Sequence, residues 1–109
     1  MPKPATSHAV RGSRTGRPIM ALLDLLGRRW SLRILWELRD HALTSRALRA
    51  ACDEASPTVL QSRLDELREA GFIALGDTGY ALTPLGRELY ATFMPLHGFA
   101  ERWRKRQSG

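Results

Sequence analysis

The chain has 109 residues, of which 43% are hydrophobic, so it can build one modest core but not two independent domains. Its apolar stretches are interrupted by charged residues and are far shorter than the roughly 18 to 20 residues that cross a bilayer. The first residues contain no apolar segment typical of a signal peptide. We therefore expect a cytoplasmic protein without a membrane partner.

The net charge of +6 is concentrated at the two ends of the chain. Residues 1–17 contain basic residues and no acid, residues 101–109 are strongly basic, and the charges between these ends nearly balance. Basic ends favour a polyanionic partner, although charge alone fits plain solubility equally well. Residues 1–16, rich in Pro, Ser, Thr and Gly, predict a disordered basic arm. We expect a folded domain at residues 17–104 and a basic tail at residues 105–109.

Metal and enzyme chemistry find little support in the sequence. Cys52 is the only cysteine, which excludes an internal disulfide and a metal site built from cysteines. His8, His41 and His97 lack the spacing that places two imidazoles on one metal. The chain also offers no nucleophile with a base and an orienting group, and no glycine-rich phosphate loop. We expect no enzyme, no catalytic residues, no metal and no cofactor.

The first half of the domain predicts three helices. Pro18 suits the first turn of an apolar helix, which Gly27 ends. Ser31 is expected to cap a second helix, and Thr44 or Ser45 a short third one. On the second and third helices we expect these residues to face inward: Leu32, Leu35, Trp36, Leu38, Ala47, Leu48 and Ala51.

A fourth helix is predicted to begin at Ser56-Pro57, where serine can cap the free amides and proline has the backbone angle of a first turn. Its leucines recur at the spacing of one buried helical stripe. They are Leu60, Leu64 and Leu67. Gly71 is expected to end this helix.

A hairpin and a long helix complete the domain. Residues 72–75 and 80–82 predict two strands that are joined by a turn at residues 76–79. Thr83-Pro84 repeats the capped helix start, and the final helix should run to about Arg104. This order of four helices, a hairpin and a helix predicts a mainly α fold with a small β-hairpin, which is a winged helix-turn-helix (α+β).

Three stretches of the sequence carry a resemblance to a known family. They are Leu25 to Leu32 followed by Ile34-Leu35, Ser56 to Leu60 with Arg63-Leu64, Glu66-Leu67 and Ala70-Gly71, and Tyr80 to Gly86. In this order and spacing the chain resembles, from about Pro18 to Trp103, the HxlR family of winged-helix regulators, which are relatives of MarR-type regulators. The resemblance implies a nucleoid-associated transcription regulator that binds double-stranded DNA as a homodimer on a palindromic operator. One recognition helix per subunit would then enter each of two successive major grooves.

The resemblance also implies that dimer contacts come from the first and last helices. The last helix agrees with this, because it has more apolar residues than one side of a small core can cover. The alternative is that this apolar stripe packs only within its own chain. The dimerisation residues that we expect are Leu22, Leu89, Phe93, Leu96, Phe99 and Trp103.

The side of the fourth helix opposite its buried stripe is expected to face DNA. Thr58, Ser62 and Asp65 lie at the centre of this side, with Val59 and Gln61 beside them. Apart from Asp65, which is too far along the helix, these side chains can contact base edges or a thymine methyl group. The alternative is a polar face that contacts only solvent.

Phosphate contacts are expected from the helix N-terminus at Ser56, from Arg63, and from Arg46 on the preceding helix. Arg28 and Arg29 are left open between phosphate contacts and salt bridges within the chain. The basic arm gives a further hypothesis, since such arms can enter a minor groove.

The chain departs from the family pattern at three places. Many members carry a sensor cysteine where this chain has Arg17, and we expect Cys52 to be buried rather than to replace that sensor. Ser45 stands where the family usually has phenylalanine, so Leu43 is expected to fill that part of the core. The turn at residues 76–79 is short and acidic, and therefore offers no cation to DNA.

Two functional questions stay open at the level of sequence. Trp30 and Trp36 could line a pocket for an unknown small-molecule effector, although their helical spacing is more typical of a core. The chain could also be a sequence-indifferent nucleic-acid binder that uses its basic ends, or a winged-helix adaptor that binds protein. Sequence-specific DNA binding is the function that the motifs favour.

Overall fold

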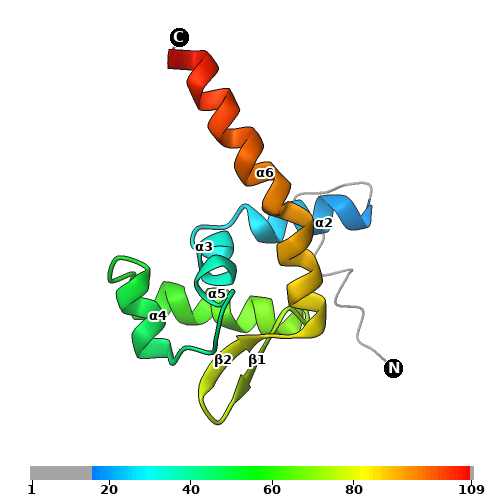
Figure 1. The fold of residues 1–109 in the computed structure, drawn as a ribbon. Coiled ribbons are helices and arrows are strands. Elements are labelled where there is room, and N and C mark those ends of the chain that lie inside the picture. Colours follow the sequence, from blue (N-terminus) through cyan, green and yellow to red (C-terminus); the bar gives the residue numbers. More distant parts are fainter. Residues whose placement is uncertain (1–15, 109) are drawn as a thin grey trace.

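The computed structural model describes residues 16–108, which form five helices and a two-stranded hairpin (Figure 1). In order these are α2 (Pro18–Leu26), α3 (Ser31–Glu37), α4 (Ser45–Ala51), α5 (Pro57–Glu69), β1 (Ile73–Gly76), β2 (Gly79–Leu82) and α6 (Pro84–Ser108). This order confirms the predicted winged helix-turn-helix fold. The expected basic arm lies, apart from Gly16, outside the described residues.

Helix α3 is the centre of the fold, because α2, α4, α5 and α6 all pack against it. The buried hydrophobic residues are Ile34, Leu35, Leu38, Leu48, Cys52, Ala55, Leu60, Leu64, Leu67, Ile73, Tyr80, Leu82 and Leu89. The predicted leucine stripe of α5 is therefore confirmed, whereas Leu32 of α3, which was expected to face inward, is 40% exposed. Cys52 is buried as expected, and Leu43 packs against the core while the neighbouring Ser45 is exposed.

The predicted caps of α4 and α5 are confirmed by hydrogen bonds from backbone amides to the side chains of the capping residues. The Ala47 amide donates to Thr44 Oγ1 at 3.1 Å, which fixes the start of α4. At the start of α5 the Val59 amide donates to Ser56 Oγ over a longer 3.5 Å, and Pro57 occupies the first helical position. Both helices therefore begin where the sequence predicts.

The prediction that Ser31 caps α3 is wrong. Trp30 precedes the helix in a left-handed conformation (φ 77°), and the Ile34 amide donates to its carbonyl at 2.9 Å. The Ser31 amide donates back to the Arg28 carbonyl at 3.1 Å, which draws Ser31 into the first turn of α3. Its side chain is consequently buried, and Ser31 Oγ has no hydrogen-bond partner among the described residues.

Gly71 and Thr83 join the end of α5 to both the hairpin and α6. Gly71 has a φ of 90°, and the amides of Gly71 and Phe72 donate to the last carbonyls of α5, in the pattern that commonly closes a helix. Thr83 Oγ1 donates to the Gly71 carbonyl at 2.6 Å and accepts from the Gly86 amide at 3.0 Å. One hydroxyl thus ties three elements together.

The hairpin pairs Ile73 with Leu82 and Gly76 with Gly79, so its turn is only Asp77-Thr78. This turn is shorter than the predicted one, because both flanking glycines belong to the strands. Leu43 adds a further bridge to β2: its amide and carbonyl bond to the Tyr80 carbonyl and amide at 2.9 and 2.8 Å. A Cβ on Gly79 would collide with the Leu43 carbonyl, so this close approach requires glycine.

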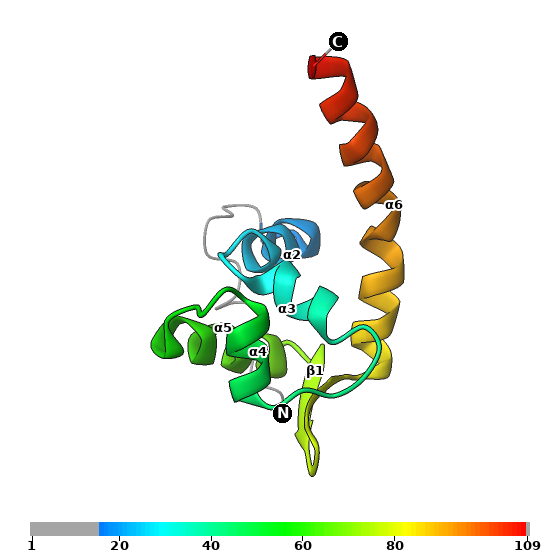
Figure 2. The same cartoon turned by 60° about the vertical axis from the view of Figure 1, so that its left-hand side comes forward.

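Helix α6 projects from the body of the protein towards its C-terminus (Figures 1 and 2). It runs through Pro95 and ends at Ser108, past the predicted end at Arg104, so the basic residues 104–106 lie on helical turns. Beyond Pro95 its side chains are almost all exposed. No helix within residues 16–108 has both the length and the apolar character that a membrane span requires.

Candidate nucleic-acid interface

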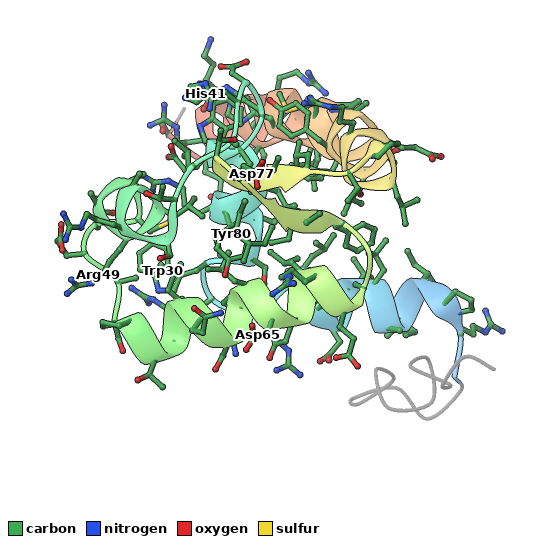
Figure 3. The ribbon with its side chains drawn as sticks, turned by 90° about the horizontal axis from the view of Figure 1, so that it is seen from below. Trp30, His41, Arg49, Asp65, Asp77 and Tyr80 are labelled. Atoms are coloured by element: carbon green, nitrogen blue, oxygen red, sulfur yellow. The ribbon has the colours of Figure 1, made fainter. Side chains whose placement is uncertain are left out.

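The exposed face of α5 lies on one side of the molecule together with α4 and the hairpin, which is the side seen in Figure 3. Its exposed positions follow one another along the helix as Thr58, Gln61, Asp65 and Arg68. Ser62 is only partly exposed. The structure therefore places Gln61 nearer the centre of the exposed face than the sequence pattern predicts.

The N-terminal end of this face is formed by Ser56, Thr58 and Val59. Ser56 and Thr58 are exposed at the first turn of α5, whereas Val59 is partly buried. The positive end of the helix dipole points out of this turn, so it suits a phosphate or another anion. Three of the predicted contact residues thus lie together at one end of the helix.

Gln61 is held in place by two side chains. Its amide nitrogen donates to Asp65 Oδ1 at 2.9 Å and lies 3.5 Å from the Tyr80 hydroxyl. Tyr80 comes from β2 and lies between the hairpin and α5 in Figure 3. Sequence reasoning did not include Tyr80 in the site, because its contact with α5 depends on how the hairpin folds back. The strand alternation around Tyr80 could only have indicated that it is buried.

A hollow of about 330 Å³ separates α4 from the first turns of α5. Its lining residues are Ser45, Arg46, Arg49, Ala50, Glu54, Pro57, Leu60 and Gln61. Arg49 is fixed at its edge, because its Nε donates to the Ala55 carbonyl at 2.9 Å and its Nη1 lies 3.6 Å from Glu54. Arg46 is exposed and forms no ion pair within residues 16–108. The predicted contact residue Arg46 and the unpredicted Arg49 therefore flank the same hollow.

The expectation that Arg63 reaches outward is not met. Its Nε and Nη2 donate to the Glu66 carboxylate at 2.9 and 3.2 Å, and only 16% of its side chain is exposed. Arg28 contacts the same carboxylate at 3.1 Å and Asp24 at 3.4 Å. The alternative of a salt bridge is therefore confirmed for Arg28. Both guanidiniums are held inside the chain because acidic partners lie within reach there.

The charge of the described face is close to balanced. The acidic residues are Asp65 on α5 and Asp77 at the tip of the hairpin (Figure 3), and the exposed basic residues are Arg46 and Arg68. The hairpin turn carries no cation, as the sequence predicts. Long-range attraction to a polyanion must therefore rely on charges outside this face.

The sequence model of the HxlR-like helix-turn-helix family matches residues 25–108. The chain belongs to this family. Among solved structures it is similar to quinone-bound YodB from B. subtilis, with 26% identity and a TM-score of 0.72 over 77% of this chain and 96% of that one. A possible HxlR family transcriptional factor from Thermoplasma volcanium GSS1 has the same fold, with 23% identity and a TM-score of 0.71 over 82% and 86% of the two chains. A comparison with curated proteins gives no match.

This HxlR-like protein also exposes apolar side chains on α2 and α6. On α6, Leu96, Phe99 and Trp103 are 60%, 53% and 55% exposed and follow one another at helical spacing. On α2, Ile19 and Leu23 are each 53% exposed, one helical turn apart. Exposed apolar stripes of this kind are typical of surfaces that bind another protein.

The six predicted dimerisation residues differ in how far they are exposed. Leu96, Phe99 and Trp103 are exposed, whereas Leu89 is buried in the core of its own chain at 8% exposure. Leu22 and Phe93 are partly buried against that core. Leu89 therefore has little surface left for a second copy, because its position on the first turns of α6 faces the body of the protein.

Trp30, at the N-cap of α3, and Trp36, within α3, are both packed against neighbouring side chains. Trp30 lies against the core, and the Arg29 guanidinium is 4.8 Å from its ring. Trp36 contacts His97 and Tyr90 of α6 at ring distances of 5.7 and 6.2 Å. These contacts favour a packing role over an effector pocket for both residues.

Proposed function

We propose that the protein is a sequence-specific regulator that binds double-stranded DNA as a homodimer, with α5 of each subunit in a major groove of a palindromic operator. The observation that carries the proposal is the N-terminal half of α5 in an HxlR-like fold, where Thr58 and Gln61 are exposed and Gln61 lines the same hollow as Arg46. A helix presented in this way next to a hairpin is typical of winged-helix DNA binding.

Base contacts are assigned to the polar side chains of α5. Gln61 can accept from a base amino group through its amide oxygen, and Thr58 can meet a base edge or a thymine methyl group. Ser62 and Val59 lie on the flanks and would contact bases only where the helix sits deep in the groove. The Asp65 and Tyr80 contacts hold the Gln61 amide and so limit the bases that it can satisfy.

Phosphate contacts are assigned to the two sides of the hollow between α4 and α5. Arg46 and Arg49 supply positive charge, and the N-terminus of α5 at Ser56 supplies its dipole. Arg63 is a weaker candidate, since its guanidinium already pairs with Glu66. We further propose that the basic residues 1–16 supply affinity from outside this face, in agreement with its balanced charge.

We assign the contacts between the two subunits of the homodimer to the exposed apolar stripes of α2 and α6. We expect a mass near twice the 12.3 kDa of one chain. Phe99→Glu should lower the mass to that of a monomer, because it places a charge in the shared apolar surface. Leu75→Glu is the matched control, since Leu75 is also half exposed but lies on the hairpin. A monomeric wild-type mass at micromolar concentration would refute the dimer.

A small-molecule effector is the remaining part of the proposal. YodB is similar in structure to this chain and was solved with a quinone. Covalent capture by a thiol is not part of our proposal, because Arg17 occupies the family's sensor position and Cys52 is fully buried (0% exposed). Burial also raises the pKa of the Cys52 thiol, which makes it a poor nucleophile at neutral pH. We therefore propose noncovalent binding of any effector.

The proposal is tested by selecting bound sequences from random duplex DNA. We expect an enriched palindrome whose half-sites are about one helical turn apart. Binding without enrichment would support a sequence-indifferent protein that uses its basic ends. No binding even at low salt would instead favour a protein adaptor.

A further inference from the structure

Four charged side chains link α2 to α5, and we call them the Glu66 cluster: Asp24, Arg28, Arg63 and Glu66. The Glu66 carboxylate accepts from Arg63 at 2.9 and 3.2 Å and from Arg28 Nη1 at 3.1 Å. Arg28 Nη2 in turn donates to Asp24 Oδ2 at 3.4 Å. Two positive and two negative groups therefore alternate within one connected set.

The cluster is partly shielded from solvent. The exposed side-chain fractions are 16% for Arg63, 23% for Arg28 and 29% for Glu66. By comparison, the pair of Arg104 and Glu101 on the projecting part of α6 is 75% and 54% exposed. Exposed pairs contribute little, whereas charge-assisted bonds at a shielded carboxylate are stronger and more directional.

Arg28 is the residue of the cluster that contacts both α2 and α5. Arg63 and Glu66 are both on α5, so their ion pair cannot by itself orient the helix. Arg28 lies 38 positions earlier in the sequence, in the connection between α2 and α3, and contacts both Glu66 and Asp24 of α2. The bond from Arg28 to Glu66 therefore provides a charged link between α2 and α5.

We infer that Glu66 is a positioning residue: through Arg28 its carboxylate locks α5 to α2. The inference rests on the proposed function, in which α5 enters the groove and α2 carries subunit contacts. The exposed Ile19 and Leu23 lie on the same short helix as Asp24. A shift of α2 against a partner subunit is therefore passed to α5 through Arg28.

Amide hydrogen exchange of the full chain tests the link without DNA. Glu66→Gln keeps the shape of the side chain and removes its charge, and Glu88→Gln is the control because Glu88 is exposed on α6. In Glu66→Gln we expect exchange to become about tenfold faster in both α2 and α5, with the hairpin and α6 unchanged. Unchanged exchange in α2 and α5 would overturn the inference. Equal acceleration in all elements would also overturn it, because that indicates a general loss of stability.

DNA binding provides the second readout. On a duplex enriched by selection, Glu66→Gln should reduce the preference over a scrambled duplex about tenfold, while Glu88→Gln leaves it unchanged. Arg28→Ala should reduce this preference by a similar factor. The double variant Arg28→Ala/Glu66→Gln should show no larger reduction in preference than either single variant. Additive losses, or an unchanged preference in Glu66→Gln, would contradict the link. If the wild type enriches no sequence, the proposed function fails while the exchange experiment still decides whether α2 and α5 are locked.

Discussion

The indole of Trp36 in α3 stacks on the imidazole of His97 in α6, with 5.7 Å between ring centroids and 18° between ring planes. The Arg39 guanidinium also lies 4.0 Å from the Trp36 ring. His97 follows Pro95, at the point where α6 leaves the body of the protein. The stack is therefore placed to fix the direction of the projecting half of α6, which carries the proposed subunit surface.

Replacement of His97 should weaken subunit association. His97→Ala removes the stack and lets the projecting half of α6 vary in direction, so we expect the dimer dissociation constant to rise about three- to tenfold. Sedimentation over a range of protein concentrations measures this constant. His41→Ala is the control, since His41 is exposed in the loop before Leu43. Equal dissociation constants for the two variants would show that the stack does not orient the helix.

Two glycines of α6 should respond in opposite ways to alanine. A Cβ on Gly86 would overlap the Phe72 carbonyl, so Gly86→Ala should lower the free energy of unfolding by about 2 kcal/mol. A Cβ on Gly98 meets only Arg102 Nη1 at an ordinary 3.6 Å. Gly98→Ala should therefore raise the free energy of unfolding by roughly 0.5 to 1 kcal/mol, because alanine favours the helix. Denaturant unfolding at one protein concentration measures both changes. A Gly86→Ala variant with the same free energy of unfolding as the wild type would contradict the close contact of Gly86 with the Phe72 carbonyl.

These positions show what the sequence could and could not predict. Thr44, Ser56 and Thr83 act locally, through bonds to amides a few residues away, and residue type with spacing was enough to identify them. Ser31 is also a hydroxyl residue next to a helix start. The left-handed Trp30 makes it the first residue of α3 instead of its cap, and the core buries its side chain. Its burial depends on packing that no local pattern contains.

Long-range pairs were the part of the site that the sequence did not specify. Arg63 pairs with Glu66 only three residues further along α5, but the contact of Glu66 with Arg28, 38 positions earlier in the sequence, depends on the fold. The same applies to Tyr80, whose contact with Gln61 needs the hairpin to fold against α5. The candidate residues of α5 were therefore found from its apolar stripe, whereas the residues that orient them required the structure.

The buried thiol should make stability depend on alkaline pH. Burial raises the pKa of Cys52, although the nearby Arg33 lowers it in part. An unfolded thiol loses its proton near pH 8.5, whereas the folded one keeps it, so the unfolded state then binds fewer protons. The free energy of unfolding should therefore be independent of this group below about pH 8 and should fall as pH rises above about 8.5. Denaturant unfolding at several pH values measures the fall.

Cys52→Ala is the reference for that measurement. It should be less stable at every pH, because it leaves a cavity in the core. The difference between wild type and variant should shrink as pH rises through the window above about 8.5. A constant difference across this range would show that the thiol ionises equally in both states.

The central claim is that Gln61 on α5 distinguishes DNA sequences while Arg46 on α4 contacts the backbone. The measurement that tests it most directly is the affinity of both alanine variants for the selected duplex and for a scrambled one. Gln61→Ala should reduce the preference for the selected duplex by roughly five- to a hundredfold. Arg46→Ala should weaken binding to both duplexes equally and lower the salt dependence by about one unit of slope. An unchanged preference in Gln61→Ala would contradict the assignment of α5 as the helix that recognises DNA.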